Sequence, residues 1–528
     1  MSFGRIHRLI RGLAVPLALA LVVACTANTP GTSSAPPGTA AASATPSGPA
    51  GTLTIAMRGD IQSTHPYLSY DIVGISYRYN VFDALVEWDY DGKLVPALAE
   101  SWKVDGKNIT FALRKGVKFH NGDPLTAADV KFSIDTLKSK ELNSGQAGNF
   151  GAVDGATVVD DNTVTVNLNK IDARILDTFA NNLSIIPMKY YQSAGQAGFI
   201  SKPIGTGPFK FVSWAKDDRV TMEANTDYWS GSPKGKPLVK TLVFRAIPTA
   251  ATRVSELKAG SVDIVQDLPP DQVDPLKSGG FNVVEAKSPV YNWAFFNTIS
   301  TSPAAKPLQD MRVRQAMNMA VDTATIIKTV LGGHARQLAG GVTDLTLGFS
   351  SDLKPFPFDQ AKAKQLLAEA GYPNGFALDA DVTNTAKQDV PQAIVAQLAQ
   401  VGIKVNLNVM PTDVFNNKWV ARQFDPMYFV TWNTFTHPDL LNLLAGCKQF
   451  LSTFCSQDAQ KFLDQGAATL DANAQTAAYT QAEKVFATDP FAIYISADNS
   501  ITALSSKVQG WKAHGITPML GTNTTVNK

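Results

Sequence analysis

The feature that most constrains the fold is a helix, a glycine and a strand that follow one another directly in the second half of the chain. The segment from Pro391 to Val401 has the apolar spacing of a helix, and Gly402 is placed to end it. Apolar and polar residues then alternate from Ile403 to Val409, as in a strand with one buried face. This succession is the unit of an open sheet covered by helices, and it predicts an α/β fold.

Strand and helix signals alternate in the same way along the rest of the chain, without an internal repeat. Thr126 stands three residues before Asp129, which is the spacing of a capping box at a helix start. Asp359 can cap another helix, which Gly371 closes. Further strands are expected at 53–57, 108–113 and 163–168.

The first 24 residues have the pattern of an export signal. Arg5, Arg8 and Arg11 form a positive region, and an apolar run from Leu13 to Ala24 follows it. This run is too short to span a bilayer, so it fits a cleaved signal peptide. Val22-Val23-Ala24-Cys25 resembles a bacterial lipobox. We therefore expect a signal peptide at 1–24 and a lipid anchor on Cys25, with more than one acyl chain for stable anchoring.

The segment at 25–51 is expected to be a flexible tether. After Cys25 it consists almost entirely of Pro, Ser, Thr, Ala and Gly, and it has no charged residue. Such a segment cannot bury a core. The chain that follows is long enough for two or three packed subdomains, but no Pro- or Gly-rich stretch within it is long enough to be a linker.

The charge balance argues against nucleic acid as a partner. The full chain has 47 basic and 45 acidic residues, which gives a formal charge of +2. Removal of 1–24 removes three arginines and no acid, so the formal charge becomes −1. A nearly neutral chain without basic runs is not typical of nucleic-acid binding.

Two cysteines remain after Cys25. Cys447 and Cys455 are eight positions apart, and an exported protein meets an oxidising compartment. We predict a local disulfide. A metal pair is the alternative, but His437 is the nearest further ligand and one histidine does not complete a site.

Sequence motifs of common enzymes are absent. The chain has no G-x-S-x-G elbow, no Walker A loop, no H-E-x-x-H and no G-x-G-x-x-G at a helix start. The five histidines that follow the signal peptide have no helical zinc spacing: His65, His120, His334, His437 and His514. We expect no catalytic residues, no metal and no cofactor.

Several stretches resemble, in order, the family 5 extracellular solute-binding proteins of bacterial ABC importers for peptides, nickel and opines. The most recognisable is Leu113–Val130, LRKGVKFHNGDPLTAADV. The others are Val81–Glu87, Leu94–Trp102, Ile204–Phe209, Asn225–Trp229, Met311–Ala316, Ala320–Asp322 and Ala363–Tyr372. The resemblance runs from about residue 52 to 520.

The resemblance implies a two-lobed α/β fold of the periplasmic-binding-protein type, class II. It implies a first lobe at 52–288 with an extra subdomain at about 80–200, a second lobe at 289–489 and a return to the first lobe at 490–528. Two crossing strands, expected near 287–292 and 489–494, form the hinge. Closure about such a hinge removes a bound solute from water.

The resemblance also implies that three short segments line the cleft, at 63–70, 290–297 and 430–437. Each combines aromatic residues with small polar ones, as a solute site requires. The expected ligand-binding residues are Trp432, Trp293, Tyr70, Asn433, Thr434 and Tyr291. The side chains of Phe295, Phe296, Asn297, His120, Arg312 and Arg314 are expected to have structural roles.

The third segment departs from the peptide-binding pattern. Peptide-binding members commonly carry an Asp for the peptide's amino group, at the position where this chain has Phe435. An ammonium group buried without a counter-charge is costly, so ordinary capture of a peptide amino terminus is in doubt. Asp439 is displaced by four positions and is expected to cap the helix 440–444. An oligopeptide, an oligosaccharide or an opine-like compound remain as solutes.

The resulting hypothesis is a monomeric, lipid-anchored binding subunit on the outer face of the cell membrane. It would capture a small peptide-like or sugar-like solute and deliver it to an ABC permease and ATPase. A ligand-sensing lipoprotein and an exported enzyme are the alternatives from other classes.

Overall fold

The computed structural model describes residues 48–528, apart from Tyr70, Thr385, residues 434–436, Lys448, Phe450, Thr517 and Lys528. The predicted signal peptide, the lipidation site Cys25 and the tether up to residue 47 lie outside the described residues. The end of the predicted tether belongs to the folded unit, which starts at Gly48. Here the N–H of Ala50 donates to the carbonyl of Leu238 at 2.9 Å, and the N–H of Thr241 donates to Gly51 at 3.1 Å.

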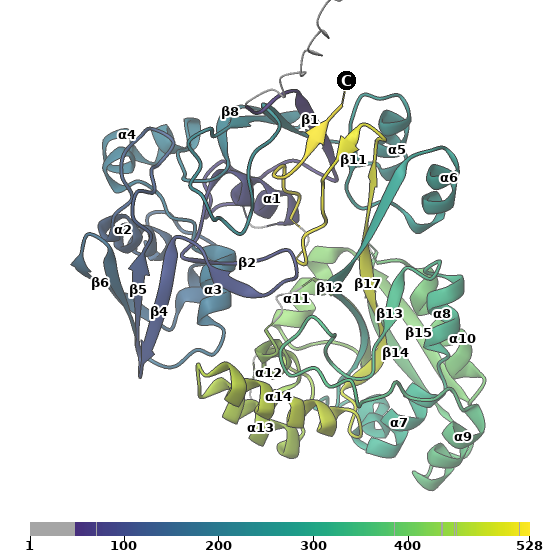
Figure 1. Ribbon diagram of the computed structural model, residues 1–528. Helices are drawn as coiled ribbons and strands as arrows, with labels where there is room; N and C mark the ends of the chain where they lie inside the picture. The colour runs from purple at the N-terminus through teal and green to yellow at the C-terminus, as the bar shows by residue number, and fades with distance from the viewer. Residues whose placement is uncertain are drawn as a thin grey trace, which may run out of the picture. The chain divides into compact units, whose positions relative to one another are not determined.

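One mixed sheet of 11 strands organises the described part of the chain (Figure 1). Its central strands β12 and β17 are joined on one side by strands of the first lobe and on the other by strands of the second. In order, the strands are β15 (Ile403–Met410), β14 (Phe376–Thr383), β16 (Met427–Asn433), β12 (Asn282–Phe296), β17 (Ala492–Leu504), β11 (Ile264–Val265), β1 (Thr52–Met57), β10 (Thr241–Ala246), β9 (Arg219–Ala224) and β8 (Phe209–Ala215), and β13 (Ala335–Gln337) also pairs with β17.

The two long strands β12 and β17 connect the lobes. The first half of β12 pairs with the end of β17, next to β11, whereas the second half pairs with β16 as well. The β12–β17 ladder is irregular between Lys287 and Val290 and again between Asn292 and Trp293. This irregular stretch coincides with the first expected crossing, 287–292. Its partners on β17 are residues 496–499, so the second expected crossing, 489–494, ends before them.

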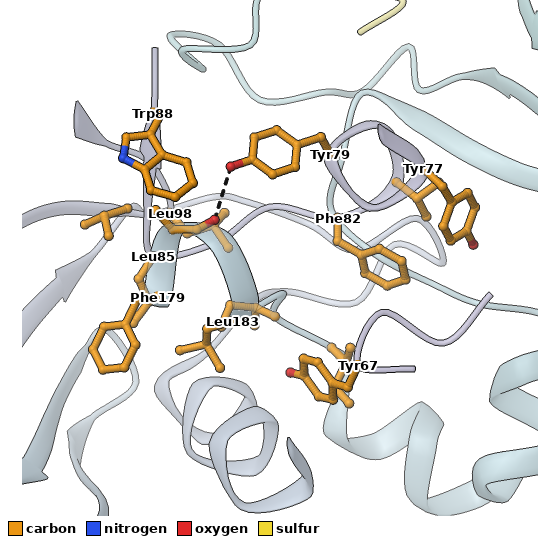
Figure 2. Close-up of a cluster of buried hydrophobic side chains, with 14 of the residues drawn as sticks. Tyr67, Tyr77, Tyr79, Phe82, Leu85, Trp88, Leu98, Phe179 and Leu183 are labelled. Atoms are coloured by element: carbon orange, nitrogen blue, oxygen red, sulfur yellow. Dashed lines mark hydrogen bonds between the residues drawn. The ribbon is translucent and has the colours of Figure 1, made fainter. Parts of the chain in front are cut away.

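The first lobe and its extra subdomain share one apolar core. The subdomain contains a four-stranded antiparallel sheet. Figure 2 shows part of the shared core, where aromatic side chains such as Trp88, Tyr79 and Phe179 come together. Trp88, Phe111 and Phe179 are among the fully buried side chains there. The sheet consists of β4 (Ala99–Asp105), β5 (Asn108–Leu113), β7 (Thr163–Leu168) and β6 (Val153–Asp160), and β2 (Val86–Trp88) pairs with β3 (Leu94–Pro96).

Six helices belong to the first lobe and its subdomain in the described residues. The predicted capping box is present, because the Asp129 carboxylate accepts from the N–H of Thr126 at 2.9 Å. The helices are α1 (Ile72–Val81), α2 (Ala127–Lys138), α3 (Ile175–Asn182), α4 (Met188–Ser201), α5 (Ala250–Lys258) and α6 (Val273–Ser278), and a short ladder joins β18 (Val508–Gln509) to β19 (Thr525–Val526).

A buried charge cluster explains several of the resembling motifs as structural. Lys234 Nζ lies 2.8 Å from carboxylate oxygens of both Asp83 and Glu87, and all three side chains are at most 3% exposed. Thr206 and Trp229, from two of the motifs, donate to the same Asp83 carboxylate at 2.9 Å. These motifs therefore hold the first lobe together rather than bind solute.

The second-lobe sheet is covered on both faces. Side chains of β16 alternate between two cores: Met427 and Phe429 lie in one, Tyr428 and Val430 in the other. The predicted helix, glycine and strand are confirmed as α10, Gly402 and β15. The helices are α7 (Met311–Met319), α8 (Thr323–Thr329), α9 (Gln360–Glu369), α10 (Asp389–Ala399), α11 (Thr412–Val420), α12 (Asp439–Ala445), α13 (Gln457–Ala467) and α14 (Ala472–Phe486).

Cys447 and Cys455, which were predicted to pair, are joined by a disulfide between α12 and α13. Both cysteines lie in the segment that joins these two helices, so the bond closes a loop within that segment. Within residues 48–528, as far as they are described, no helix has the length and apolar character needed to cross a membrane.

Candidate functional site

Two adjoining cavities lie beside the strands that connect the lobes. The larger has a volume of about 440 Å³ and the other about 410 Å³. Arg58, Leu331, Lys387 and Asp498 line both, so the two cavities lie directly beside each other. We call the two cavities together the cleft. It takes residues from the first lobe, the second lobe and the connecting strands.

The sheet topology accounts for the position of the cleft. Strands β14 and β15 are parallel, and β16 runs parallel to β14, so their carboxyl ends lie on one side of the second lobe. In the first lobe β1 and β11 are also parallel, and Arg58 and Gln266 directly follow them. Loops at the carboxyl ends of parallel strands form the binding crevice of open α/β sheets. Here both lobes present such loops to the cleft.

Aromatic side chains form one wall of the cleft. Phe415 and Trp419 come from α11, and Trp293 comes from β12. The Trp419 indole donates to the carbonyl of Leu451 at 3.1 Å, which fixes its ring. The Trp293 ring is 1% exposed, and its Nε1 has no acceptor among the described residues. A buried N–H without an acceptor is unfavourable, and a bound molecule with an acceptor would relieve it.

Charged groups of the cleft occur in pairs. Arg58 lies 3.4 Å from Asp267, and Lys387 lies 3.2 Å from Asp498. The Asp498 carboxylate also accepts from Asn292 at 2.7 Å, and its side chain is only 17% exposed. The Arg58 and Lys387 side chains are 51% and 58% exposed. The Lys387–Asp498 pair therefore combines a held acid with an exposed cation, whereas Asp267 in the other pair is itself 44% exposed.

One edge of β16 faces the cleft. Its ladder with β14 contains only the pairs at Met427 and Tyr428, whereas its ladder with β12 continues to Asn433. Phe429, Val430 and Thr431 line the cavity. In an antiparallel pair, alternate residues direct their N–H and C=O groups away from the partner strand. This edge can therefore offer main-chain hydrogen bonds to a bound molecule.

The structure brings some of the predicted site residues to the cleft and not others. Trp293 lines it. Tyr291 stacks on Trp293 with ring centroids 4.7 Å apart, and its hydroxyl lies 2.5 Å from Thr346 Oγ1, so it supports Trp293 from the core. Trp432 is half-buried and contacts Trp419 edge-to-face at 5.1 Å, behind the cleft wall. Tyr70 and Thr434, together with the side chain of Asn433, lie outside what the structure describes.

The described part of the first expected cleft segment, 63–69, packs inside the first lobe instead. The Tyr67 hydroxyl donates to Ser184 O at 2.5 Å, and His65 Nε2 lies 3.3 Å from the Tyr191 hydroxyl. These side chains are buried because the segment fills the core beside the extra subdomain. From this region the cleft receives Ile72 at the start of α1.

Two of the residues that were expected to have structural roles form hydrogen bonds inside their own lobes. His120 Nε2 lies 3.0 Å from Gly207 O, and burial lowers the pKa of this imidazole to about 4. Arg314 is buried and donates to Leu308 O and Pro490 O at 2.7 and 2.9 Å. Neither residue lines the cleft.

Arg58, Lys387, Asp498 and the aromatic face of α11 line the cleft without a sequence motif that marks them. The positions of Arg58 and Lys387 could have been found from the order of elements. Arg58 directly follows the strand predicted at 53–57, and Lys387 lies shortly before the helix predicted at 391–401. Asp498 lies within β17, and nothing in its local sequence distinguishes it from a solvent-exposed strand residue. In the described residues no group of three or more His, Cys, Asp or Glu side chains could hold a metal ion.

Comparison with known proteins adds a family match. Residues 93–450 match the family model described as "Bacterial extracellular solute-binding proteins, family 5 Middle". The glutathione-binding protein GsiB of Pectobacterium atrosepticum is 29% identical over 493 residues, which are 90% of this chain and 94% of the relative. Heme-binding protein A of Haemophilus influenzae is 34% identical over 63% of this chain and 66% of its own length.

Solved structures of the same kind superpose over nearly the whole described chain. HbpA2 from Haemophilus parasuis has a TM-score of 0.81 at 27% identity, with 90% of this chain and 100% of that chain covered. The periplasmic binding protein DppA from Helicobacter pylori, in complex with the peptide STSA, has a TM-score of 0.73 at 27% identity, with 91% and 98% covered. The predicted two-lobed α/β fold is thereby confirmed.

Proposed function

The chain belongs to the bacterial extracellular solute-binding proteins of family 5, and we propose that it is the lipid-anchored binding subunit of an ABC importer. It captures a small peptide-like solute between its lobes and passes it to a membrane permease and its ATPase. The observation that carries this proposal is the cleft, which residues of both lobes line beside the two connecting strands. A molecule held there contacts both lobes, so its binding favours the closed form that a permease can distinguish.

The cleft chemistry supports a solute with a polar backbone and apolar substituents. The aromatic wall of Phe415 and Trp419 offers apolar area, and the free edge of β16 offers main-chain donors and acceptors. Lys387 and Asp498 offer both signs of charge. Relatives named for binding glutathione and a solved relative with a bound tetrapeptide are consistent with this class.

The predicted residues Trp432, Asn433, Thr434 and Tyr70 remain proposed solute contacts. Replacement of the usual Asp by Phe435 indicates that a peptide amino group would not be held in the usual place. Asp498 and Asp267 are the acids among the described lining residues, and Asp498, which both cavities share, is the proposed partner of such an amino group. An oligosaccharide or opine-like solute would use the same aromatic wall, but only a neutral oligosaccharide would have less need of the paired charges.

The test of solute class is calorimetric titration of residues 48–528 with three probes: reduced glutathione, a tetrapeptide and an oligosaccharide of similar size. We expect saturable binding of a peptide-like probe, with a negative heat-capacity change because aromatic surface is buried. Binding of the oligosaccharide alone would overturn the peptide-like assignment. Absence of binding to all three would remove the support for this class of solute.

The anchor is tested separately. Because Cys25 follows a lipobox-like triplet and precedes an uncharged segment, Cys25→Ser should move the protein from the membrane to the soluble exported fraction. Cell fractionation after a high-salt wash measures this. Retention of the Cys25→Ser protein on membranes would contradict the lipoprotein assignment.

A further inference from the structure

The lobes also meet at a second place, away from the connecting strands. Arg174, at the start of α3 in the first-lobe subdomain, reaches an acid of the second lobe: its Nε lies 3.3 Å from Asp439 Oδ2. The same guanidinium forms two contacts of 3.2 Å with Asp172, two residues earlier. Figure 1 shows α3 on the side of the subdomain that faces α12 and α14. Arg174 thus forms a two-point contact, which we call a fork, with Asp172 of its own lobe, and one ion pair with the other lobe.

Two further contacts accompany this bond. Gln475 Nε2, from α14, donates to the carbonyl of Ala173 at 3.2 Å, and both residues are about 95% buried. Leu470, which precedes α14, packs against the apolar core of the first lobe. An ion pair, a hydrogen bond and an apolar contact therefore act at one place. We call the group formed by Arg174, Ala173, Asp439 and Gln475 the interlobe latch.

The second-lobe side of the latch is held ready by its own neighbours. Asp439 was expected to cap α12, but Pro438 is the N-cap residue there and no side-chain cap bond forms. The Asp439 carboxylate instead accepts from the Tyr479 hydroxyl and from Asn442 Nδ2, both at 3.2 Å. Its side chain is 15% exposed. A carboxylate fixed in this way loses little freedom when a cation of the other lobe docks on it.

We propose that the interlobe latch sets the balance between the open and closed forms, and that Arg174 is therefore a positioning residue for solute binding. The connecting strands β12 and β17 permit the lobes to rotate, whereas separation of the lobes must break the latch contacts. A solute that binds only the closed form has a higher apparent affinity when the latch raises the population of that form. Arg174 would then affect affinity for any solute without touching it.

The test uses residues 48–528 without solute, because this range is one compact unit. Small-angle X-ray scattering measures the radius of gyration of the wild type and of Arg174→Ala. We expect Arg174→Ala to be more extended, because loss of one charge-assisted bond changes the closed-to-open ratio by roughly tenfold. Arg174→Lys retains the cation and should restore part of the compact form.

Arg312→Ala is the matched control. Arg312 forms the same fork with an acid two residues earlier, Asp310, but the whole contact lies within the second lobe. Its scattering should equal that of the wild type. If Arg174→Ala does not fold, the isosteric Asp439→Asn carries the same expectation.

The proposal is overturned if a folded Arg174→Ala or Asp439→Asn protein scatters as the wild type does. Equal radii of gyration would mean that the latch contacts do not favour the closed form. Since no solute is present, neither result depends on the proposed transport function.

Discussion

Two lysine–aspartate pairs, one in the first lobe and one in the cleft, show how this chain separates structure from binding. Lys234 and Asp83 are 2% and 0% exposed and 2.8 Å apart. Lys387 and Asp498 are 58% and 17% exposed and 3.2 Å apart. The first pair has been removed from water completely, whereas the second keeps a cation that solvent or a solute can reach.

The surroundings of the two pairs differ in the same direction. Burial alone would raise the pKa of Asp83, but Lys234 and the donors from Trp229 and Thr206 outweigh it and hold this pKa below its ordinary value. Burial raises the pKa of the neighbouring Glu87 to about 7 despite Lys234. Asp83 is therefore the acid that remains charged against the lysine. A pair so fully enclosed fixes the fold, while a half-exposed pair can exchange partners.

The largest effect is expected at the buried pair. Lys234→Met leaves the Asp83 carboxylate buried without a counter-charge, which should lower the free energy of unfolding by roughly 3–5 kcal/mol. Urea unfolding at neutral pH measures this. The exposed neighbour Lys236→Met is the control and should change it by less than about 0.5 kcal/mol. Equal midpoints for the two variants would show that the buried cluster has no structural weight.

A buried acid without any cation sharpens the comparison. Glu483 is 1% exposed and accepts from the N–H of Gly341 at 3.0 Å, and burial raises its pKa from 4.5 to about 8. Because the folded pKa is the higher one, the folded state binds the proton more tightly. The contribution of this group is fully present below pH 4.5 and is lost as the pH rises through about 8.

Wild type should therefore lose roughly 3–4 kcal/mol more stability than Glu483→Gln between pH 5 and pH 9, at about 1.4 kcal/mol per pKa unit. Urea unfolding of both proteins at the two pH values measures the difference. The exposed Glu369→Gln serves as the control. A pH dependence that is unchanged in Glu483→Gln would contradict the raised pKa.

The smallest effect on stability, but a large one on binding, is expected at the cleft pair. Lys387→Gln should change the free energy of unfolding by at most about 1 kcal/mol, because exposed ion pairs contribute little. Affinity for the peptide-like probe that the wild type binds should fall roughly tenfold, as for the loss of one charged hydrogen bond. Lys404→Gln, exposed on β15, is the control in both measurements. An unchanged affinity would remove Lys387 from the site.

The sequence predicted the fold well because periodicity is a local signal. The alternation from Ile403 to Val409 and the capping box at Thr126 each depend on a few neighbouring residues, and both are present. The end of the tether was placed too late, because the bonds of Ala50 and Gly51 are made with residues almost 200 positions away. Composition alone carries no information about such partners.

The site was predicted only in part for the same reason. Trp293 lines the candidate cleft, whereas Tyr291, two positions away on the same strand face, stacks behind it. Which of two such aromatics reaches the cavity depends on the rotation of the sheet against α11, and no local pattern records that. Asp439 was assigned to a helix cap, since its partner Arg174 is far away in the chain.

Occupation of the cleft by a solute can be measured by native mass spectrometry of the chain purified gently from an exporting host. Thr431 is an exposed residue whose side chain lies at the cavity, so Thr431→Trp should fill part of that space. Val212→Trp, exposed on β8 of the first lobe, adds the same bulk elsewhere. We expect a small co-purified mass on the wild type and on Val212→Trp but not on Thr431→Trp. The same mass on all three proteins, or on none, would contradict it.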